Sequence, residues 1–177
     1  SVALSTHSHC PVTVVHAWPT GGYTQSEAVV VGVDGTSAAT AAVELAFEEA
    51  DVRGAPLTAV YAWADSDLSI GMSVPGLEWA VHRPEVDDVL ASALDDCAQR
   101  HPTVPLRHVT VRDRPAHALL DHAQGAQLLV LGSHGRGGFA GMMLGSTSRS
   151  VVARASCPVT VVPSVARSRT TAAKEYL

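Results

Sequence analysis

An uninterrupted apolar run at residues 28–33 constrains the fold of this chain more than any other feature. Its sequence, Ala-Val-Val-Val-Gly-Val, is rich in β-branched residues and does not alternate between apolar and polar positions. Such a run is typical of a strand that is buried on both faces, as strands are in parallel sheets covered by helices. We therefore expect residues 28–33 to form a central strand of an α/β domain.

The rest of the chain alternates predicted strands with predicted helices. Further strands are predicted at residues 57–63, 106–111, 127–131 and 158–162. The intervening helices are predicted from Thr36 or Ser37 to Gly54, over residues 85–100, from Pro115 to about Gln124, and over residues 146–155. Side-chain caps, a proline in a first helical turn and a terminating glycine mark these helix ends. This order predicts a parallel sheet with helices packed on it.

A repeated hexapeptide indicates how the chain is divided. Cys-Pro-Val-Thr-Val-Val occurs at residues 10–15 and again at residues 157–162. Since Cys and Pro are uncommon residues, we interpret the repeat as the trace of two similar domains. The predicted division is a tail of an upstream domain, with its last helix and strand, at 1–16, a linker at 17–26, a complete domain at 27–165, and a polar tail without fixed structure at 166–177.

Composition excludes several classes of function. The formal net charge of -5 argues against binding of nucleic acid, which requires a clustered excess of Lys and Arg. No apolar run reaches the roughly 20 residues of a membrane helix, so no membrane association is expected. The three cysteines are scattered and odd in number, which does not suggest a disulfide framework and favours a reducing, cytoplasmic location.

A glycine-rich stretch at residues 132–148 is the strongest candidate site. It follows a predicted strand, holds six glycines and leads into a predicted helix. Glycines let main-chain N–H groups approach a polyphosphate, and the amides at a helix N-terminus favour an anion. Ser146, Thr147 and Ser148 add hydroxyl donors. The alternative interpretation is a flexible surface loop.

Asp34 is the second candidate, because it ends the strand predicted at residues 28–33. Ligands of open parallel sheets bind outside the carboxyl ends of the strands. A carboxylate there can accept hydrogen bonds from ribose or adenine or support a metal. The alternative is a turn residue that binds its own backbone.

Other nucleotide and catalytic motifs are missing or misplaced. Residues 135–140 fit G-x-G-x-x-A, but they do not follow the first strand, and no Gly-Lys-Ser/Thr of a P-loop occurs. No G-x-S-x-G elbow or Ser-His-Asp order appears, so we assign no catalytic residue. His7, His9 and Cys10 are close in sequence but span a predicted helix-to-strand junction, and we predict no metal site there.

The spacing of the glycine-rich stretch resembles the nucleotide-binding signature of the universal stress protein family. Gly132 is followed after two residues by Gly135, and after nine more by Gly145 and Ser146. Asp34 after a buried strand, residues 60–63 and residues 157–159 are also similar to that family. The resemblance covers residues 27–163 and implies an open five-stranded parallel sheet with helices on both faces. This Rossmann-like, adenine nucleotide alpha hydrolase-like fold has the strand order 3-2-1-4-5.

The resemblance further implies a stress-response and signalling module that binds ATP with Mg²⁺. The adenine end would lie near Gly32, Val33, Asp34 and Ala62, with Leu131 walling the pocket. The phosphates would meet Gly132, Ser133, Gly135, Arg136, Gly145, Ser146, Thr147 and Ser148. His134 would either touch phosphate or face solvent.

The family also implies antiparallel pairing between fifth strands, as a homo-dimer or within a tandem pair of domains. We therefore predict that residues 12–15 lie beside residues 159–162. Two alternatives to a binding module stay open: a slow ATPase or nucleotide-transfer enzyme that uses the same site, and a nucleotide-free dimerisation domain.

Overall fold

The computed structural model describes residues 8–15, 28–63, 94–135 and 144–163. The strands are β1 (Val12–Val14), β2 (Val29–Gly32), β3 (Leu57–Trp63), β4 (Leu106–Arg112), β5 (Leu128–Gly132) and β6 (Val159–Val162). The helices are α2 (Ser37–Arg53), α4 (Pro115–His122) and α5 (Ser146–Arg154), and residues 94–100 are also helical.

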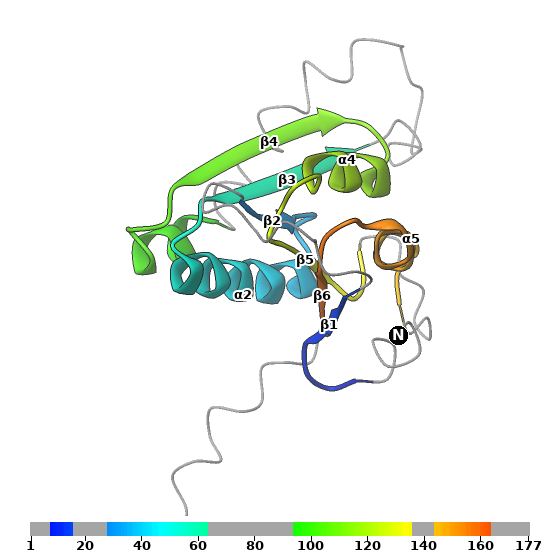
Figure 1. Ribbon diagram of the computed structural model, residues 1–177, viewed down its shortest axis with the longest axis horizontal. Coiled ribbons are helices and arrows are strands. Elements are labelled where there is room, and N and C mark those ends of the chain that lie inside the picture. Colours follow the sequence, from blue (N-terminus) through cyan, green and yellow to red (C-terminus); the bar gives the residue numbers. More distant parts are fainter. Residues whose placement is uncertain (1–7, 16–27, 64–93, 136–143, 164–177) are drawn as a thin grey trace, which may run out of the picture.

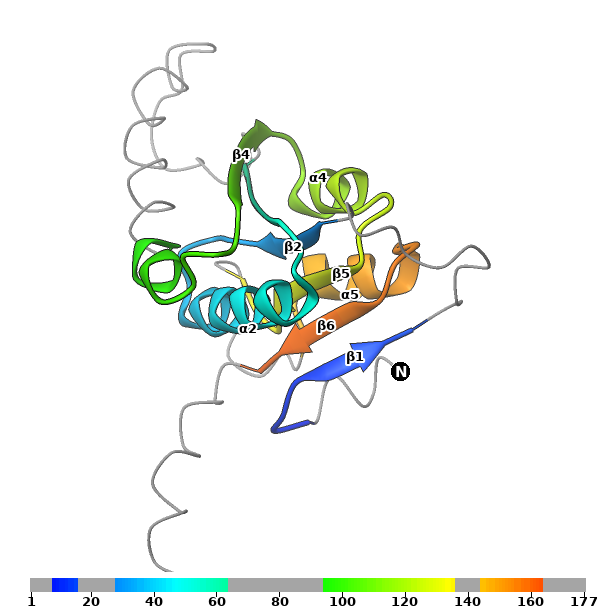
Figure 2. The same ribbon diagram turned by 60° about the vertical axis from the view of Figure 1, so that its left-hand side comes forward.

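These strands form one sheet in the order β1-β6-β5-β2-β3-β4. The pairs β2 with β3, β2 with β5, β3 with β4, and β5 with β6 are all parallel. The α/β class and the predicted order of the five parallel strands are therefore confirmed. The predicted strand count is one short, because β1 adds an antiparallel sixth strand beyond β6 (Figure 2).

The pairing of β1 with β6 is the one that the family resemblance implies for residues 12–15 and 159–162. Val12 lies opposite Val161, Thr13 opposite Thr160 and Val14 opposite Val159. The predicted linker at residues 17–26 and the tail at 166–177 lie outside the described residues.

Helices cover both faces of the sheet, with α2 on one side and α4 and α5 on the other (Figure 1). Alternate residues of β2 point into two separate cores. Val29 and Val31 pack with the α2 side, whereas Val30 packs with the α4 and α5 side, and all three are at most 1% exposed. This double burial is why residues 28–33 show no polar alternation.

Local signals fix the ends of α2 where the sequence predicts them. The Thr36 hydroxyl accepts a hydrogen bond from the Ala39 amide at 3.2 Å, so Thr36 is the N-cap. At the other end Gly54 has φ +60°, a left-handed conformation that favours glycine, and its amide donates to the Asp51 carbonyl. Pro115 occupies the first turn of α4, as predicted.

The remaining boundaries agree with the predictions to within one or two residues. The strand predicted at 28–33 is shorter than expected at both ends, yet the Val33 amide still donates to the Val60 carbonyl at 2.9 Å. Of the helix predicted at residues 85–100, the structure describes and confirms 94–100. Within the described ranges, no helix is long and apolar enough to cross a membrane.

We expect one of the three thiols to react in the folded protein. Burial raises the pKa of the Cys157 thiol to about 11 and also raises the pKa of the Cys97 thiol, whereas Cys10 is exposed. Because the thiolate is the reactive form, a disulfide reagent at pH 7.5 should titrate one thiol before unfolding and three after it. Cys10→Ser should remove the native reaction; fast labelling that survives this substitution would contradict the burial of the other two.

Candidate functional site

Three neighbouring strands bring the predicted site residues to one edge of the sheet. Strand β2 lies between β3 and β5, and all three run in the same direction. Gly32 and Gly132 end β2 and β5, and Ala62 lies two positions beyond Val60, the partner of Gly32. Segments almost 100 residues apart in sequence therefore meet at the carboxyl edge of the sheet.

A tight turn holds Asp34 at this edge. Gly35 has φ +78°, which favours glycine, and it turns the chain back so that Thr36 faces the carboxylate. Asp34 Oδ1 accepts hydrogen bonds from the Thr36 amide at 3.0 Å and from the Thr36 hydroxyl at 2.7 Å. The alternative interpretation, in which Asp34 is a turn residue that binds nearby backbone, is thus correct for Oδ1.

The second carboxylate oxygen of Asp34 faces the glycine-rich stretch. A Cβ atom built on Gly135 would lie 2.8 Å from Asp34 Oδ2. A side chain at position 135 would therefore have to displace the carboxylate. The structure brings together the two candidates that the sequence placed separately, Asp34 and the Gly132–Gly135 segment.

Hydrogen bonds join the two ends of the glycine-rich stretch. The Gly145 amide donates to the Ser133 carbonyl at 2.8 Å, and the Ser148 hydroxyl donates to the Gly132 carbonyl at 2.8 Å. The Ser133 amide donates to the Val162 carbonyl, also at 2.8 Å, which fastens the same segment to β6. The start of α5 is in this way fixed against the end of β5.

Close packing explains the glycines at the ends of β2 and β5. A Cβ on Gly132 would lie 2.9 Å from the backbone carbonyl carbon of Ala38, in the first turn of α2. A Cβ on Gly32 would lie 2.8 Å from Leu131 Cδ2 and 3.1 Å from Leu119 Cδ2. Leu131 is buried, and its side chain occupies the space that a Cβ on Gly32 would need.

Two of the helices that begin at this edge, α2 and α5, differ in the hydrogen-bond acceptors of their first amides. In α2 the Thr36 hydroxyl accepts from one of them, and the Asp34 carboxylate adds a negative charge beside the same helix end. In α5 the N-cap is Gly145, which has no side chain to offer. Since the first amides of an α-helix lack intrahelical acceptors, the N-terminus of α5 suits an anion.

The charged groups along this edge suit different parts of a ligand. The Asp34 carboxylate repels an anion, but it is of the kind that accepts hydrogen bonds from hydroxyl or N–H groups of a ligand. The α5 end attracts an anion. A ligand with a hydroxylated or N–H-bearing end and an anionic end matches this arrangement.

The hydroxyl residues of the site fall into two groups. Ser133 and Ser148 are buried, at 4% and 5% exposure, and the Ser148 proton is used within the fold. Ser146 is exposed and Thr147 half-buried, in the first turn of α5. His134 Nδ1 lies 3.0 Å from Ser133 Oγ, next to this turn. Arg136 lies outside the described residues.

Sequence reasoning did not assign Gly35, Thr36 and Leu119 to this site. Thr36 was identified as a helix cap, but not as the residue that holds Asp34. The Asp34-Gly35-Thr36 sequence itself carried that signal, because Asp-Gly favours a turn and a following Thr binds the carboxylate. No sequence pattern indicates that Leu119 lies beneath Gly32.

Comparison with known proteins identifies relatives over most of the chain. The family model described as the universal stress protein family matches residues 25–163. Universal stress protein Rv2623 of Mycobacterium tuberculosis (strain ATCC 25618 / H37Rv) is 41% identical over 165 residues, which cover 91% of this chain and 54% of that protein. The chain thus spans about half the length of the curated relatives it matches.

Solved structures agree in fold. The universal stress protein UspA from Lactobacillus plantarum is 29% identical, with a TM-score of 0.59, over 77% of this chain and 98% of its own. A universal stress protein crystallised in complex with cAMP is 27% identical, with a TM-score of 0.59, over 78% of this chain and 98% of its own.

Two glycine substitutions should differ in their effect on stability, because one glycine packs against backbone and the other against a side chain. Gly132→Ala forces a Cβ against the α2 backbone, so it should lower the free energy of unfolding by roughly 1–3 kcal/mol. Gly135→Ala meets the end of a side chain, so its stability should stay within about 0.5 kcal/mol of the parent. Urea unfolding of both variants checks this; equal stabilities would contradict the close approach at Gly132.

Proposed function

The chain belongs to the universal stress protein family, and from that premise we propose that it binds ATP with Mg²⁺ as a nucleotide-dependent module of a stress response. The observation that carries the proposal is that an anion-binding helix N-terminus and a carboxylate lie at the same edge of the sheet. The uncapped N-terminus of α5 suits phosphates, and the Asp34 carboxylate suits the sugar and base. The complex of a similar protein with cAMP supports an adenine nucleotide as the ligand class.

In this proposal the backbone does most of the binding. The Gly135 amide and the amides of the first turn of α5 receive the phosphates, with Ser146 and Thr147 adding hydroxyl donors; the Ser133 amide is bonded to the Val162 carbonyl and holds the segment in place. Gly135 lets the main chain come close to the Asp34 carboxylate, which brings the two ends of the proposed site together. Gly32, Val33 and Ala62 line the adenine end, and Arg136 adds a positive charge near the phosphates.

Mg²⁺ fits the donors at this site. This ion keeps several waters and is usually held by one or two carboxylates together with substrate phosphates. Asp34 and the hydroxyls of Ser146 and Thr147 are oxygen donors of the kind it prefers. When bound, Mg²⁺ would neutralise phosphate charge, and the main-chain amides would stabilise the same charge through hydrogen bonds.

Binding without rapid turnover is the form we propose. A general base needs a free acceptor aimed at an attacking water. Asp34 Oδ1 is already bonded to Thr36, and His134 Nδ1 lies within hydrogen-bond distance of Ser133 Oγ. Both of these acceptor atoms are thus engaged within the fold, and the ADP-release measurement below tests whether another acceptor activates a water.

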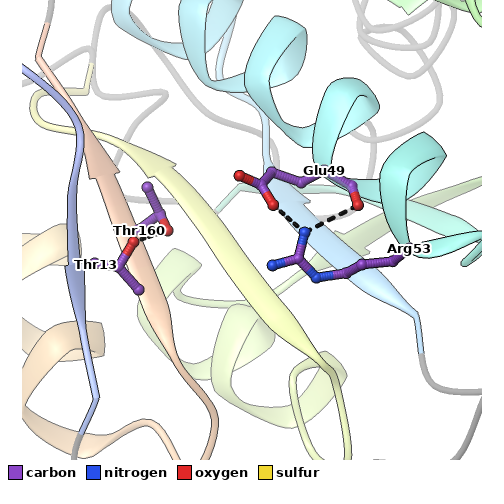
Figure 3. Close-up of polar contacts among 4 residues, drawn as sticks. All are labelled: Thr13, Glu49, Arg53 and Thr160. Carbon is purple, nitrogen blue, oxygen red and sulfur yellow. Dashed lines mark hydrogen bonds and ion pairs between the residues drawn. The ribbon is translucent and has the colours of Figure 1, made fainter.

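The strand pairing supports a tandem origin for β1. The two copies of the hexapeptide are 147 positions apart, so Thr13 is the counterpart of Thr160, and these two residues lie opposite each other. Their hydroxyls are 2.8 Å apart (Figure 3). The pairing is thus symmetric about Thr13 and Thr160, as it would be between two like domains. We infer that residues 1–16 come from an upstream domain and that the complete domain spans 27–165.

The surroundings of these threonines fit the same inference. On one side α2 lies beside the strands, with Glu49 and Arg53 paired on it (Figure 3). A cavity of about 230 Å³ lies between this part of α2 and the strands, with Thr13, Glu49, Arg53 and Thr160 among its lining residues. We infer that the other side of the cavity is filled by the upstream domain's counterpart of α2.

ATP with Mg²⁺ should stabilise the protein. At a hundredfold excess over the Kd, a ligand of the folded state adds about 2.7 kcal/mol, so the melting temperature should rise measurably. Asp34→Asn retains the Oδ1 acceptor for Thr36 but removes the charge, and it should weaken binding about tenfold. The exposed Asp95→Asn is the matched control and should bind as the parent does.

The same samples test turnover and ligand identity. ATP, AMP and cAMP are compared by thermal shift, and ADP release is followed in the ATP sample. ADP release that Asp34→Asn abolishes would favour an enzyme. The absence of any shift with ATP at millimolar concentration would favour a nucleotide-free dimerisation domain.

Detaching β1 should expose the unpaired edge of β6, which can then associate with another chain. Val14 is 6% exposed and pairs with Val159, so Val14→Arg should unseat β1 and let the β6 edges of two chains pair. Light scattering after gel filtration should then show concentration-dependent dimers. The neighbouring Val15 is 51% exposed, and Val15→Arg should leave the parent mass unchanged. A folded, monomeric Val14→Arg variant would contradict the proposal.

A further inference from the structure

We propose that Asp113, His117 and Asp121 form a binding site for a divalent transition-metal ion of the zinc class. The three residues lie on α4 and the segment that leads into it, outside the nucleotide site proposed above. Their spacing of four residues places them on one side of the helix. The opposite side of α4 is anchored in the core by Ala118 and Leu119, so the three side chains lie on an outer face.

Three different donor groups converge at this position. His117 Nδ1 lies 2.5 Å from Asp113 Oδ2 and 3.7 Å from Asp121 Oδ2. All three ligand atoms lie within 4.8 Å of one another. Two carboxylates thus approach the same ring nitrogen from successive turns, and with a neutral imidazole the cluster has a charge of -2.

The distances are close to those of a tetrahedral zinc site. Zinc binds His nitrogen and carboxylate oxygen at about 2.0–2.2 Å, which separates neighbouring ligand atoms by roughly 3.4 Å. The Asp121 contact is near this value already, and the Asp113 oxygen has to withdraw by about 1 Å. Small side-chain rotations on an exposed surface suffice, since the exposed fractions are 33% for Asp113 and above one half for the other two.

The backbone orients the first ligand before any ion arrives. Asp113 Oδ1 accepts a hydrogen bond from the Arg114 amide at 2.7 Å, which leaves Oδ2 directed at His117. The His117 amide donates to the Arg114 carbonyl at 2.9 Å, and Pro115 restricts the first turn. Partners that fix a ligating carboxylate in this way raise metal affinity.

The donor set selects the class of ion. One imidazole and two carboxylates, with a fourth position open to water, match sites that zinc and its neighbours among the transition metals occupy. Mg²⁺ and Ca²⁺ prefer oxygen ligands alone, so they should compete poorly. An ion pair between His117 and Asp113 is the alternative account of the same contacts, and the experiment has to separate the two.

The test is a zinc titration of the nucleotide-free full chain in the Cys10→Ser background. That substitution removes the exposed thiol, so that zinc uptake is not confused with binding to a surface cysteine. Competition with a chromophoric chelator gives the affinity, and Co²⁺ in place of zinc gives visible bands that report coordination. We expect one ion per chain, and no displacement by an excess of Mg²⁺.

Variants on the same helix assign the ligands. His117→Ala should weaken zinc binding by well over tenfold, and Asp121→Asn by about tenfold. His122→Ala changes the next imidazole along the chain and is the matched control, with unchanged affinity expected. Without metal, the melting temperatures of His117→Ala and Asp121→Asn should lie close to that of the parent, because both side chains are more than half exposed.

Three outcomes would overturn the proposal. The first is that the parent protein takes no zinc from the chelator at any protein concentration. The second is equal binding by His117→Ala and the parent, and the third is equal loss in His122→Ala and His117→Ala. If the proposal is correct, the NMR resonances of the His117 imidazole shift on addition of metal, while those of His122 do not.

Discussion

The parallel pairing of β2 with both β3 and β5 is the constraint on which the rest of the structure depends. It buries Val29, Val30 and Val31 from two sides at once, and it requires a helix on each face of the sheet. Because parallel strands all end at the same edge, it also delivers Gly32 and Gly132 to neighbouring positions. The candidate site is a consequence of that direction of pairing. An antiparallel arrangement of the same strands would have placed the two glycines at opposite edges.

The candidate site at this edge is formed mainly by backbone. Gly132 lets the first turn of α2 contact the end of β5, and Gly135 lets the main chain come close to the Asp34 carboxylate. The side chains that remain mostly hold the backbone in place, as Thr36 does for Asp34 and Ser148 does for Gly132. A site of this kind tolerates many side-chain changes, but not a Cβ at a point of close approach. This explains why a spacing of glycines carries more information about the family than any catalytic side chain.

Sequence patterns predicted the elements well, because each one had a local signal. Residues 57–63 form a strand with the expected bounds, and Thr36 and Gly54 delimit α2 through interactions within a few residues. The inward direction of the Ser148 hydroxyl had no such signal, since its acceptor lies sixteen residues away. The grouping of Asp113, His117 and Asp121 was also missed. Side-chain rotamers, which no sequence pattern fixes, decide whether such residues converge.

The Val162 carbonyl has a position that links two parts of the protein. It accepts the Ser133 amide from the glycine-rich stretch, and it belongs to β6, the strand that pairs with β1. One main-chain hydrogen bond therefore connects the carboxyl edge of the sheet with the β6–β1 pair. If Ser133 moves, either β6 moves with it or this hydrogen bond breaks. In a chain with two such domains sharing one continuous sheet, each pocket would have a rigid mechanical connection to its twin.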